Sequence, residues 1–160
     1  MALGTTDLTT LKAVFRAAVE GLSPTHVRSQ VIGWHSIPGD RPARPGHAMR
    51  VFTLRFEPSN FVPDGLYGEE YAGVGVHEVE SYLVVTVDYG GVPSEVLDEV
   101  VDDDLYDLAA TFEDLAAPTT TGLVSVENIG DPIDIADDNE GDQAQVEFRF
   151  LVRYMKLRPS

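Results

Sequence analysis

The sequence has 160 residues, 43% of them hydrophobic, and its 27 acidic and 11 basic residues give a formal net charge of −16 at pH 7. This length and composition predict a single domain over residues 1–160 with one hydrophobic core. Cysteine is absent, which excludes disulfides, thiolate metal sites and cysteine nucleophiles, and no apolar run reaches the roughly 18 residues of a membrane span, so we expect a soluble protein without a membrane partner.

The first predicted element is an amphipathic helix over residues 7–22. Its apolar side chains recur at spacings of three and four and form one stripe, made of Leu8, Leu11, Phe15, Val19 and Leu22. Thr6 or Asp7 is suited to cap the N-terminus of this helix. Gly21 and Pro24 are suited to end it, because glycine often follows a helix and proline cannot continue one.

Two strand-like segments follow, separated by a connector rich in proline and glycine. Residues 25–34 are compatible with a short strand, and residues 38–46 contain three prolines and two glycines that enforce an irregular path. Residues 49–57 alternate, with every second side chain apolar from Phe52 to Phe56. This period is typical of a half-buried strand.

Residues 58–76 are expected to form a projecting arm or a long hairpin. The segment contains two prolines and four glycines and is too long for a tight turn. Its aromatic residues are Phe61, Tyr67 and Tyr71. Because aromatic side chains commonly pack on a partner, we assign these three to a subunit interface. A solvated surface loop is the alternative.

The centre of the chain predicts a second strong strand and a second helical region. Residues 77–89 have the period of a strand, and two glycines end it. One face carries Val79, Ser81, Leu83, Val85, Val87 and Tyr89. Residues 93–115 carry a helical apolar stripe, made of Leu97, Val101, Leu105, Leu108, Phe112 and Leu115. Residues 102–104 are three aspartates that can split this region into two helices, with Asp103 or Asp104 capping the second.

The chain closes with strands. Residues 123–128 form one, residues 133–136 form a possible shorter one, and residues 137–142 form the turn that completes an acidic segment over 131–142. The last strand begins at Ala144 and alternates for about fourteen residues, which exceeds the usual five or six. It is therefore expected to lie centrally in a sheet or to extend past the domain.

Together these elements predict an α+β fold. Connections of the hairpin type between the C-terminal strands indicate a mostly antiparallel sheet, packed on one side by two or three helices. The long projecting arm or hairpin would leave this sheet between the two strong strands. No internal repeat marks a second domain.

The negative charge is concentrated in one block. From Asp88 to Asp142 the chain carries 17 acidic residues and no Lys, Arg or His, so the remainder has a net charge of about +1. One charged region on an otherwise balanced chain indicates one face with an electrostatic role. We assign that role to the carboxylates of the acidic segment, which are Asp131, Asp134, Asp137, Asp138, Glu140 and Asp142.

A calcium loop is the first motif that the acidic segment suggests. An EF-hand loop needs oxygen ligands at its positions 1, 3, 5 and 12 and glycine at position 6. With Gly141 at position 6, Ala136 takes position 1 and cannot coordinate, so the loop fails. A different cation site is the minor alternative, with Asp134, Asp137, Asp138 and Asp142 as ligands.

Other catalytic and cofactor motifs are missing from the sequence. The four histidines show no pair at metal-ligand spacing, no serine lies in a nucleophile elbow, and no phosphate loop is present. Residues 102–104 would point about 100° apart on a helix, which does not let them converge on one ion. They indicate a helix cap or a solvated face. We therefore expect no enzyme, no cofactor and no metal.

The local basic cluster is a poor nucleic-acid site. No aromatic platform is interleaved with its members, which are Arg41, Arg44, Arg50 and Arg55. These residues are better suited to pair with the acidic face of a neighbouring copy, a heterologous contact that closes into a ring if the rotation permits. We assign Arg41 and Arg44 to that interface.

The order of elements resembles that of the tail terminator (tail completion) proteins of long-tailed phages and related archaeal viruses. The shared features are an amphipathic N-terminal helix, a Pro/Gly connector into a strand, an arm between two long strands, a following helix and a closing strand through Val146 to Tyr154. They cover most of the chain. The acidic segment 131–142 and the connector 38–46 depart from shorter members of the family, so contacts there do not carry over.

The resemblance implies a homo-oligomer, in the form of a hexameric ring that caps the finished tail tube, stops its polymerisation and offers a surface to head-closure or neck proteins. It implies DNA that passes through the centre without sequence-specific binding, and no catalysis. Such a protein is assembled in the host cytoplasm and carried in the tail or neck of the virion. Because acidic side chains repel phosphates, the segment 131–142 is expected to face the lumen or the tail.

Three other functions stay open. Another neck component or a tail tube subunit would also use a sheet-based ring, but a tube subunit would polymerise without limit. An acidic adaptor or nucleic-acid mimic would remain monomeric or dimeric and bind a basic partner. A carboxylate hydrolase would need a divalent metal.

Overall fold

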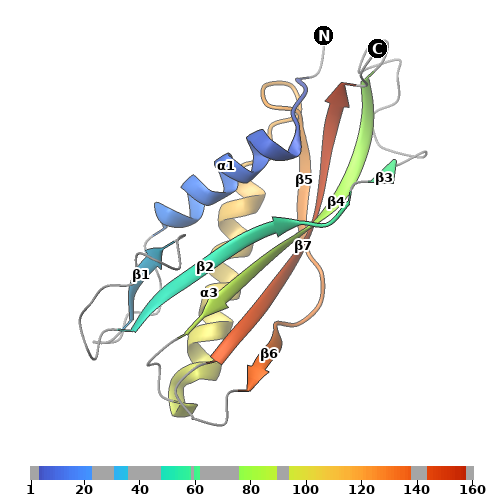
Figure 1. Ribbon diagram of the computed structural model, residues 1–160. Coiled ribbons are helices and arrows are strands. Elements are labelled where there is room, and N and C mark those ends of the chain that lie inside the picture. The colour runs from blue at the N-terminus through green and yellow to red at the C-terminus, as the bar shows by residue number, and fades with distance from the viewer. Residues whose placement is uncertain are drawn as a thin grey trace.

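The computed structural model describes residues 4–22, 31–35, 48–58, 60–61, 76–89, 94–137 and 144–157. The elements follow one another as α1 (Leu8–Glu20), β1 (Val31–His35), β2 (Ala48–Phe56), β3 (Asn60–Phe61), β4 (Val76–Asp88), α3 (Ser94–Asp114), β5 (Leu123–Asn128), β6 (Ile133–Asp137) and β7 (Ala144–Leu157). The strands form one twisted sheet, and both helices lie on the same side of it (Figure 1).

The sheet is built around the antiparallel pair of β4 and β7. The strand order is β1-β2-β4-β7-β5, with β3 beside β4 and β6 beside β7. β4 and β7 pair continuously from Val76 opposite Leu157 to Asp88 opposite Gln145, whereas β1 and β2 run parallel. This arrangement confirms the predicted α+β fold with a mostly antiparallel sheet, and it places the long last strand in the middle.

Helix α1 lies within the predicted range of 7–22 and is capped at Asp7 and Gly21, two of the residues predicted for its ends. The Asp7 carboxylate accepts a hydrogen bond from the Thr10 N–H at 2.8 Å, which satisfies one of the donors that a helix start leaves open. At the other end, the Gly21 N–H donates to the Ala17 carbonyl. The buried residues of the helix are Leu11, Phe15 and Val19, as the stripe predicts.

A stack of phenylalanines connects both helices to the sheet. The rings of Phe15 and Phe112 meet edge-on with centroids 4.9 Å apart, and Phe112 meets Phe150 in the same way at 4.9 Å. Phe15 also lies 6.1 Å from Phe56. Because Phe56 and Phe150 both pair with Leu83 of β4, they form one row across the sheet. Both helices therefore pack on the same face of the sheet.

Helix α3 is one continuous helix from Ser94 to Asp114, so the predicted split at residues 102–104 is wrong. Asp104 does not cap a second helix, because it is fully buried and accepts a hydrogen bond from the Tyr89 hydroxyl. A row of buried side chains on α3 recurs every fourth residue, at Val100, Asp104, Leu108 and Phe112. Four members of the predicted stripe are only partly buried, namely Leu97, Val101, Leu105 and Leu115.

The residues before α1 lie against the turn that precedes β5. The Gly4 N–H donates to the Pro118 carbonyl at 3.0 Å, and the Thr6 N–H donates to the Met155 carbonyl at 2.8 Å. Gly122 in this turn has a φ of 81°, and a Cβ there would lie 2.6 Å from the Gly4 carbonyl oxygen. Glycine is required at position 122 both for the dihedral and for this close approach.

The predicted arm can be followed only at its start. Residues 60–61 form β3, where Asn60 lies opposite Glu80 and Phe61 opposite Val79. The chain therefore continues along β4 after β2 and does not leave the sheet at once. Residues 62–75 of the predicted arm lie outside the described residues, as does the connector 38–46.

The acidic segment 131–142 is a strand in part. Residues 133–137 form β6, which pairs with β7 from Ile133 opposite Glu147 to Asp137 opposite Ala144. The predicted strand at 133–136 is confirmed, and it continues through Asp137, which was expected to begin the turn. Residues 138–142 lie outside the described residues.

Candidate functional site

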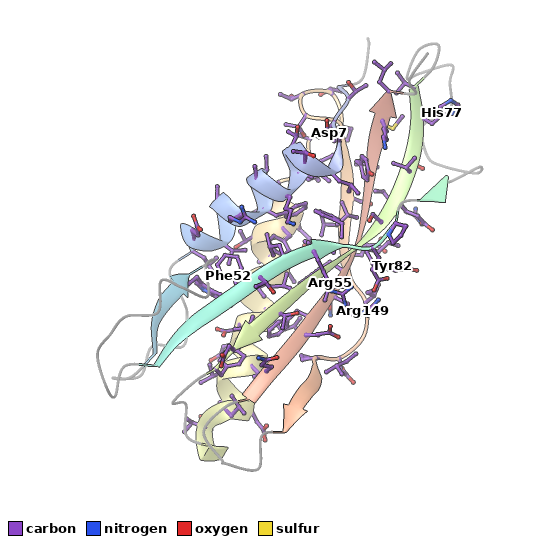
Figure 2. All side chains as sticks on the ribbon, in the orientation of Figure 1. Asp7, Phe52, Arg55, His77, Tyr82 and Arg149 are labelled. Carbon is purple, nitrogen blue, oxygen red and sulfur yellow. The ribbon has the colours of Figure 1, made fainter. Side chains whose placement is uncertain are left out.

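The face of the sheet opposite α1 and α3 carries a set of paired charges, and we call it the helix-free face because no helix of the described residues covers it. The Arg55 guanidinium lies 3.3 Å from the Glu147 carboxylate and 3.8 Å from that of Glu57. Arg149 reaches the same Glu57 carboxylate at 2.8 Å. The labelled side chains of Arg55, Arg149 and Tyr82 lie together on this face, away from the two helices (Figure 2). We call the group of Arg55, Glu57, Glu147 and Arg149 the charged cluster.

Strand register explains why these charges meet. Arg55 pairs with Val84 in β4, and Val84 pairs with Arg149 in β7, so the three residues form one row. Glu57 lies one row further along, since its N–H donates to the Tyr82 carbonyl. Rows of opposite charge therefore alternate. Exposed pairs of this kind each stabilise a fold by about 0.2–1 kcal/mol.

Val84 lies at the centre of this face and is nevertheless fully buried. Its neighbours on both sides are arginines, Arg55 and Arg149, whose alkyl stems can cover apolar surface while their guanidinium groups stay in water. The Arg149 guanidinium carbon also lies 5.8 Å from the centre of the Tyr82 ring. The charged cluster contains two cations and two anions, so this part of the face is close to electrically neutral.

The exposed face of α3 differs sharply from the sheet face. Its exposed acidic residues are Asp98, Glu99, Asp102, Glu113 and Asp114. No basic residue occurs anywhere between Asp88 and Asp142, so the helix itself offers no compensating charge. Tyr106 projects from this face with 75% of its surface exposed. Much of the protein's net negative charge therefore lies on the helical side of the sheet.

A hollow of about 230 Å³ lies beside α3. Its walls are Leu97, Asp98, Val101, Asp102, Pro132 and Val146. Four of these residues are apolar, and the two aspartates are exposed on the surface of the helix. The hollow is the place where α3, the residues before β6 and the first part of β7 come together. We call it the α3 hollow.

Asp104, a buried acid on α3, serves the fold. The Tyr89 hydroxyl donates to the Asp104 carboxylate at 2.8 Å, and both side chains are buried. The contact ties the end of β4 to the middle of α3. The predicted helix cap and the predicted solvated face are therefore both wrong for Asp104. Asp102 is exposed, as predicted.

The predicted site residues fall in different parts of the chain. Those outside the described residues are Arg41, Arg44, Tyr67, Tyr71, Asp138, Glu140 and Asp142. Phe61 belongs to β3, Asp134 and Asp137 belong to β6, and Asp131 is exposed just before β6. Since β3 borders β4 and β6 borders β7, Phe61 and the acidic segment lie on opposite sides of the central strand pair.

Arg55 departs from its predicted use. It was predicted, with the other arginines of the basic cluster, to pair with the acidic face of a neighbouring copy. In the structure it pairs with Glu147 of its own chain. The charged cluster was missed because Arg55 and Glu147 are 92 residues apart in the sequence. The one available signal was the alternation of charge along the last strand, at Glu147, Arg149 and Arg153.

Three further observations concern metal ligands, membrane-spanning helices and similarity to known proteins. Among the described residues, no group of three or more His, Asp or Glu side chains is placed to hold a metal ion. Neither α1 nor α3, the helices in the described part of the chain, combines the length and apolarity needed to cross a membrane. No protein-family model and no curated protein sequence matches this chain.

Proposed function

We propose that this protein is a structural subunit of a virion that forms a ring, caps the tail tube, ends tube polymerisation and joins the tail to the head or neck. The observation that carries the proposal is the arrangement of its elements. An N-terminal helix and α3 cover one face of a mostly antiparallel sheet, and two long strands flank the segment 58–76. This is the element order on which the resemblance to tail terminators rests.

We assign the subunit contacts of the ring to β3, to the residues that follow it in the sequence and to the connector 38–46. β3 forms a border of the sheet next to β4, and residues 62–75 follow it directly. We assign Phe61, Tyr67 and Tyr71 to contacts with one neighbour, and Arg41 and Arg44 to its acidic surface. The tail tube protein and the head-closure or neck protein then bind the two rims of the ring.

The acidic segment faces the lumen or the tail tube in this proposal. β6 carries Asp134 and Asp137 at the border of β7, so their backbone is fixed by the sheet. Carboxylates along a channel repel the phosphates of passing DNA and prevent it from binding. Replacing Asp134, Asp137 and Asp138 by asparagine should slow DNA ejection, and unchanged infectivity of the triple variant would argue against a lumen position.

The tube-capping activity can be measured with tail tube protein of the same virus. Adding this protein while tubes polymerise should stop growth and leave tubes that carry a ring at one end in negative-stain images. Removing residues 62–75 should abolish the effect, because the ring would not form. Tubes of undiminished length in the presence of the full chain would contradict the proposal.

A second candidate is an acidic adaptor that binds a basic protein. The exposed Tyr106 in the midst of the carboxylates of α3 favours it, because tyrosine is enriched at the anchor positions of protein interfaces. An adaptor would stay monomeric or dimeric and would bind in a salt-sensitive manner. It would have no effect on the length of tail tubes.

A further inference from the structure

We propose that the α3 hollow is a docking site for a basic segment of a partner protein, with an arginine side chain as its anchor. This inference goes beyond the proposed function, because it holds for a ring subunit and for an adaptor alike. It rests on the shape of the hollow, on the charges at its edge and on the surface around it.

The size of the hollow selects its occupant. Small-molecule sites usually enclose about 300–1,000 Å³, and the α3 hollow measures about 230 Å³. A space of this size accepts one long side chain. It lies at the surface between α3 and the strand β7, where an extended segment of a partner can lie across it.

The chemistry of the walls selects a long cation. Leu97, Val101, Pro132 and Val146 provide an apolar surface, while Asp98 and Asp102 contribute carboxylates. An arginine has an apolar stem and a planar cationic head that forms paired hydrogen bonds with carboxylates. Its stem would lie on the apolar wall, and its guanidinium would lie against Asp98 and Asp102, which are one helical turn apart.

The surroundings extend the same preference. Tyr106 lies one further turn along the face of Asp98 and Asp102 and is 75% exposed. Ile133, which follows Pro132, is 45% exposed. These two exposed side chains belong to α3 and β6 and offer a partner further apolar contact. No Lys, Arg or His residue occurs between Asp88 and Asp142. The negative charge of this surface is therefore complementary to a basic segment and repels nucleic acid.

The helix-free face of the sheet does not compete for the same partner. Its charged cluster is internally paired, with Arg55 on Glu147 and Arg149 on Glu57. A cationic segment would gain little charge attraction there and would meet two arginines. The α3 side is therefore the part of the described surface where a basic segment binds most favourably.

The test uses the full chain and two synthetic peptides. The first peptide is rich in arginine with a single central aromatic residue, and the second has the same sequence with every arginine replaced by citrulline, which keeps the shape and removes the charge. Calorimetry at low salt should show binding of the arginine peptide and at least about tenfold weaker binding of the citrulline peptide. In the complex, the methyl NMR signals of Leu97 and Val101 should shift. Absence of binding, equal affinity for both peptides, or binding without these shifts would overturn the proposal.

Matched variants separate the hollow from general charge attraction. Asp98→Asn with Asp102→Asn should weaken the binding of the arginine peptide at least about tenfold. Glu113→Gln with Asp114→Asn removes an equal amount of charge elsewhere on α3 and should weaken the binding less than about threefold. Val101→Phe, which fills the hollow and keeps the charge, should also weaken binding. Circular dichroism confirms that each variant is folded. Equal losses for the two double variants would show nonspecific attraction and overturn the proposal.

Discussion

The Tyr89 hydroxyl donates a hydrogen bond to the Asp104 carboxylate at 2.8 Å, and this buried contact joins the end of β4 to the middle of α3. A buried carboxylate is costly unless it receives hydrogen bonds. Tyr89 supplies one from the end of β4, and because a hydrogen bond is directional, the pair fixes the position of α3 along the sheet in a way that apolar packing alone does not.

Removing this donor should destabilise the protein. We expect Tyr89→Phe to lower the free energy of unfolding by about 1–3 kcal/mol, because it leaves Asp104 with one hydrogen bond fewer in a buried environment. Urea unfolding of Tyr89→Phe, Asp104→Leu and the double variant completes a double-mutant cycle. The double variant should lose less than the sum of the single variants. Strict additivity would show that the two side chains do not interact.

Gly122 should tolerate no side chain. Its φ of 81° disfavours a residue with a side chain, and a Cβ at this position would lie only 2.6 Å from the Gly4 carbonyl oxygen. We expect Gly122→Ala to lower the free energy of unfolding by about 2–4 kcal/mol. Gly130 is the matched control, since its φ is 83° but nothing lies within 4 Å of a Cβ there. Gly130→Ala should cost about 1 kcal/mol. If thermal unfolding showed the same loss of stability for both variants, the close approach of Gly4 would not contribute to the requirement for glycine at position 122.

The cap of α1 should give the stability a measurable pH dependence. Hydrogen bonds from the Thr10 backbone N–H and hydroxyl, together with the charge of Lys156, hold the pKa of the Asp7 carboxyl below its usual range. A carboxyl with a lowered folded pKa stabilises the fold above its unfolded pKa, near pH 4, and loses that effect as the pH falls through the folded pKa. The Tm difference between the wild type and Asp7→Ala should therefore be largest at neutral pH and narrow below about pH 4.

Asp7→Asn is the control for this experiment. Asparagine also accepts the hydrogen bond of a helix cap but carries no charge. It should lie between the wild type and Asp7→Ala in Tm at neutral pH. A Tm difference between the wild type and Asp7→Ala that stays constant from pH 7 to pH 2 would contradict the pKa assignment.

Arg149 should stabilise the sheet more through its stem than through its charge. Arg149→Met keeps the apolar cover of Val84 and removes the ion pair with Glu57, so we expect a loss of about 0.5–1 kcal/mol that shrinks at high salt. Arg149→Ala also uncovers Val84 and should cost about 1 kcal/mol more. Equal stability of the two variants in urea unfolding would show that Val84 is covered by other groups.

The elements that depend on local pattern were predictable from the sequence. Helix α1 has a cap at Asp7 and a stripe through Phe15, both readable within about twenty residues. The last strand alternates over most of its length, and that length indicated either a central position or an extension past the domain. The pairing of β7 with β4 on one side and β5 on the other shows the central position. In these segments the local preference and the tertiary structure agree.

The features that depend on contacts between distant segments were not predictable. Asp104 is polar in the sequence and buried in the structure, because its partner Tyr89 lies 15 residues away on another element. Leu97 and Val101 fit a helical core stripe, but they are partly exposed and line the α3 hollow with Pro132 and Val146. The register of β2, β4 and β7 decides which charges meet in the charged cluster, and alternation within one strand does not encode it.

The native mass of the full chain tests the proposed function most directly. Native mass spectrometry combined with negative-stain imaging should show one closed ring whose mass is six times the 17.5 kDa of a single chain. The ring should persist at low micromolar concentration and should not grow longer as the concentration rises. A single chain at every concentration, or a polymer of open-ended length, would contradict the assignment as a tail terminator.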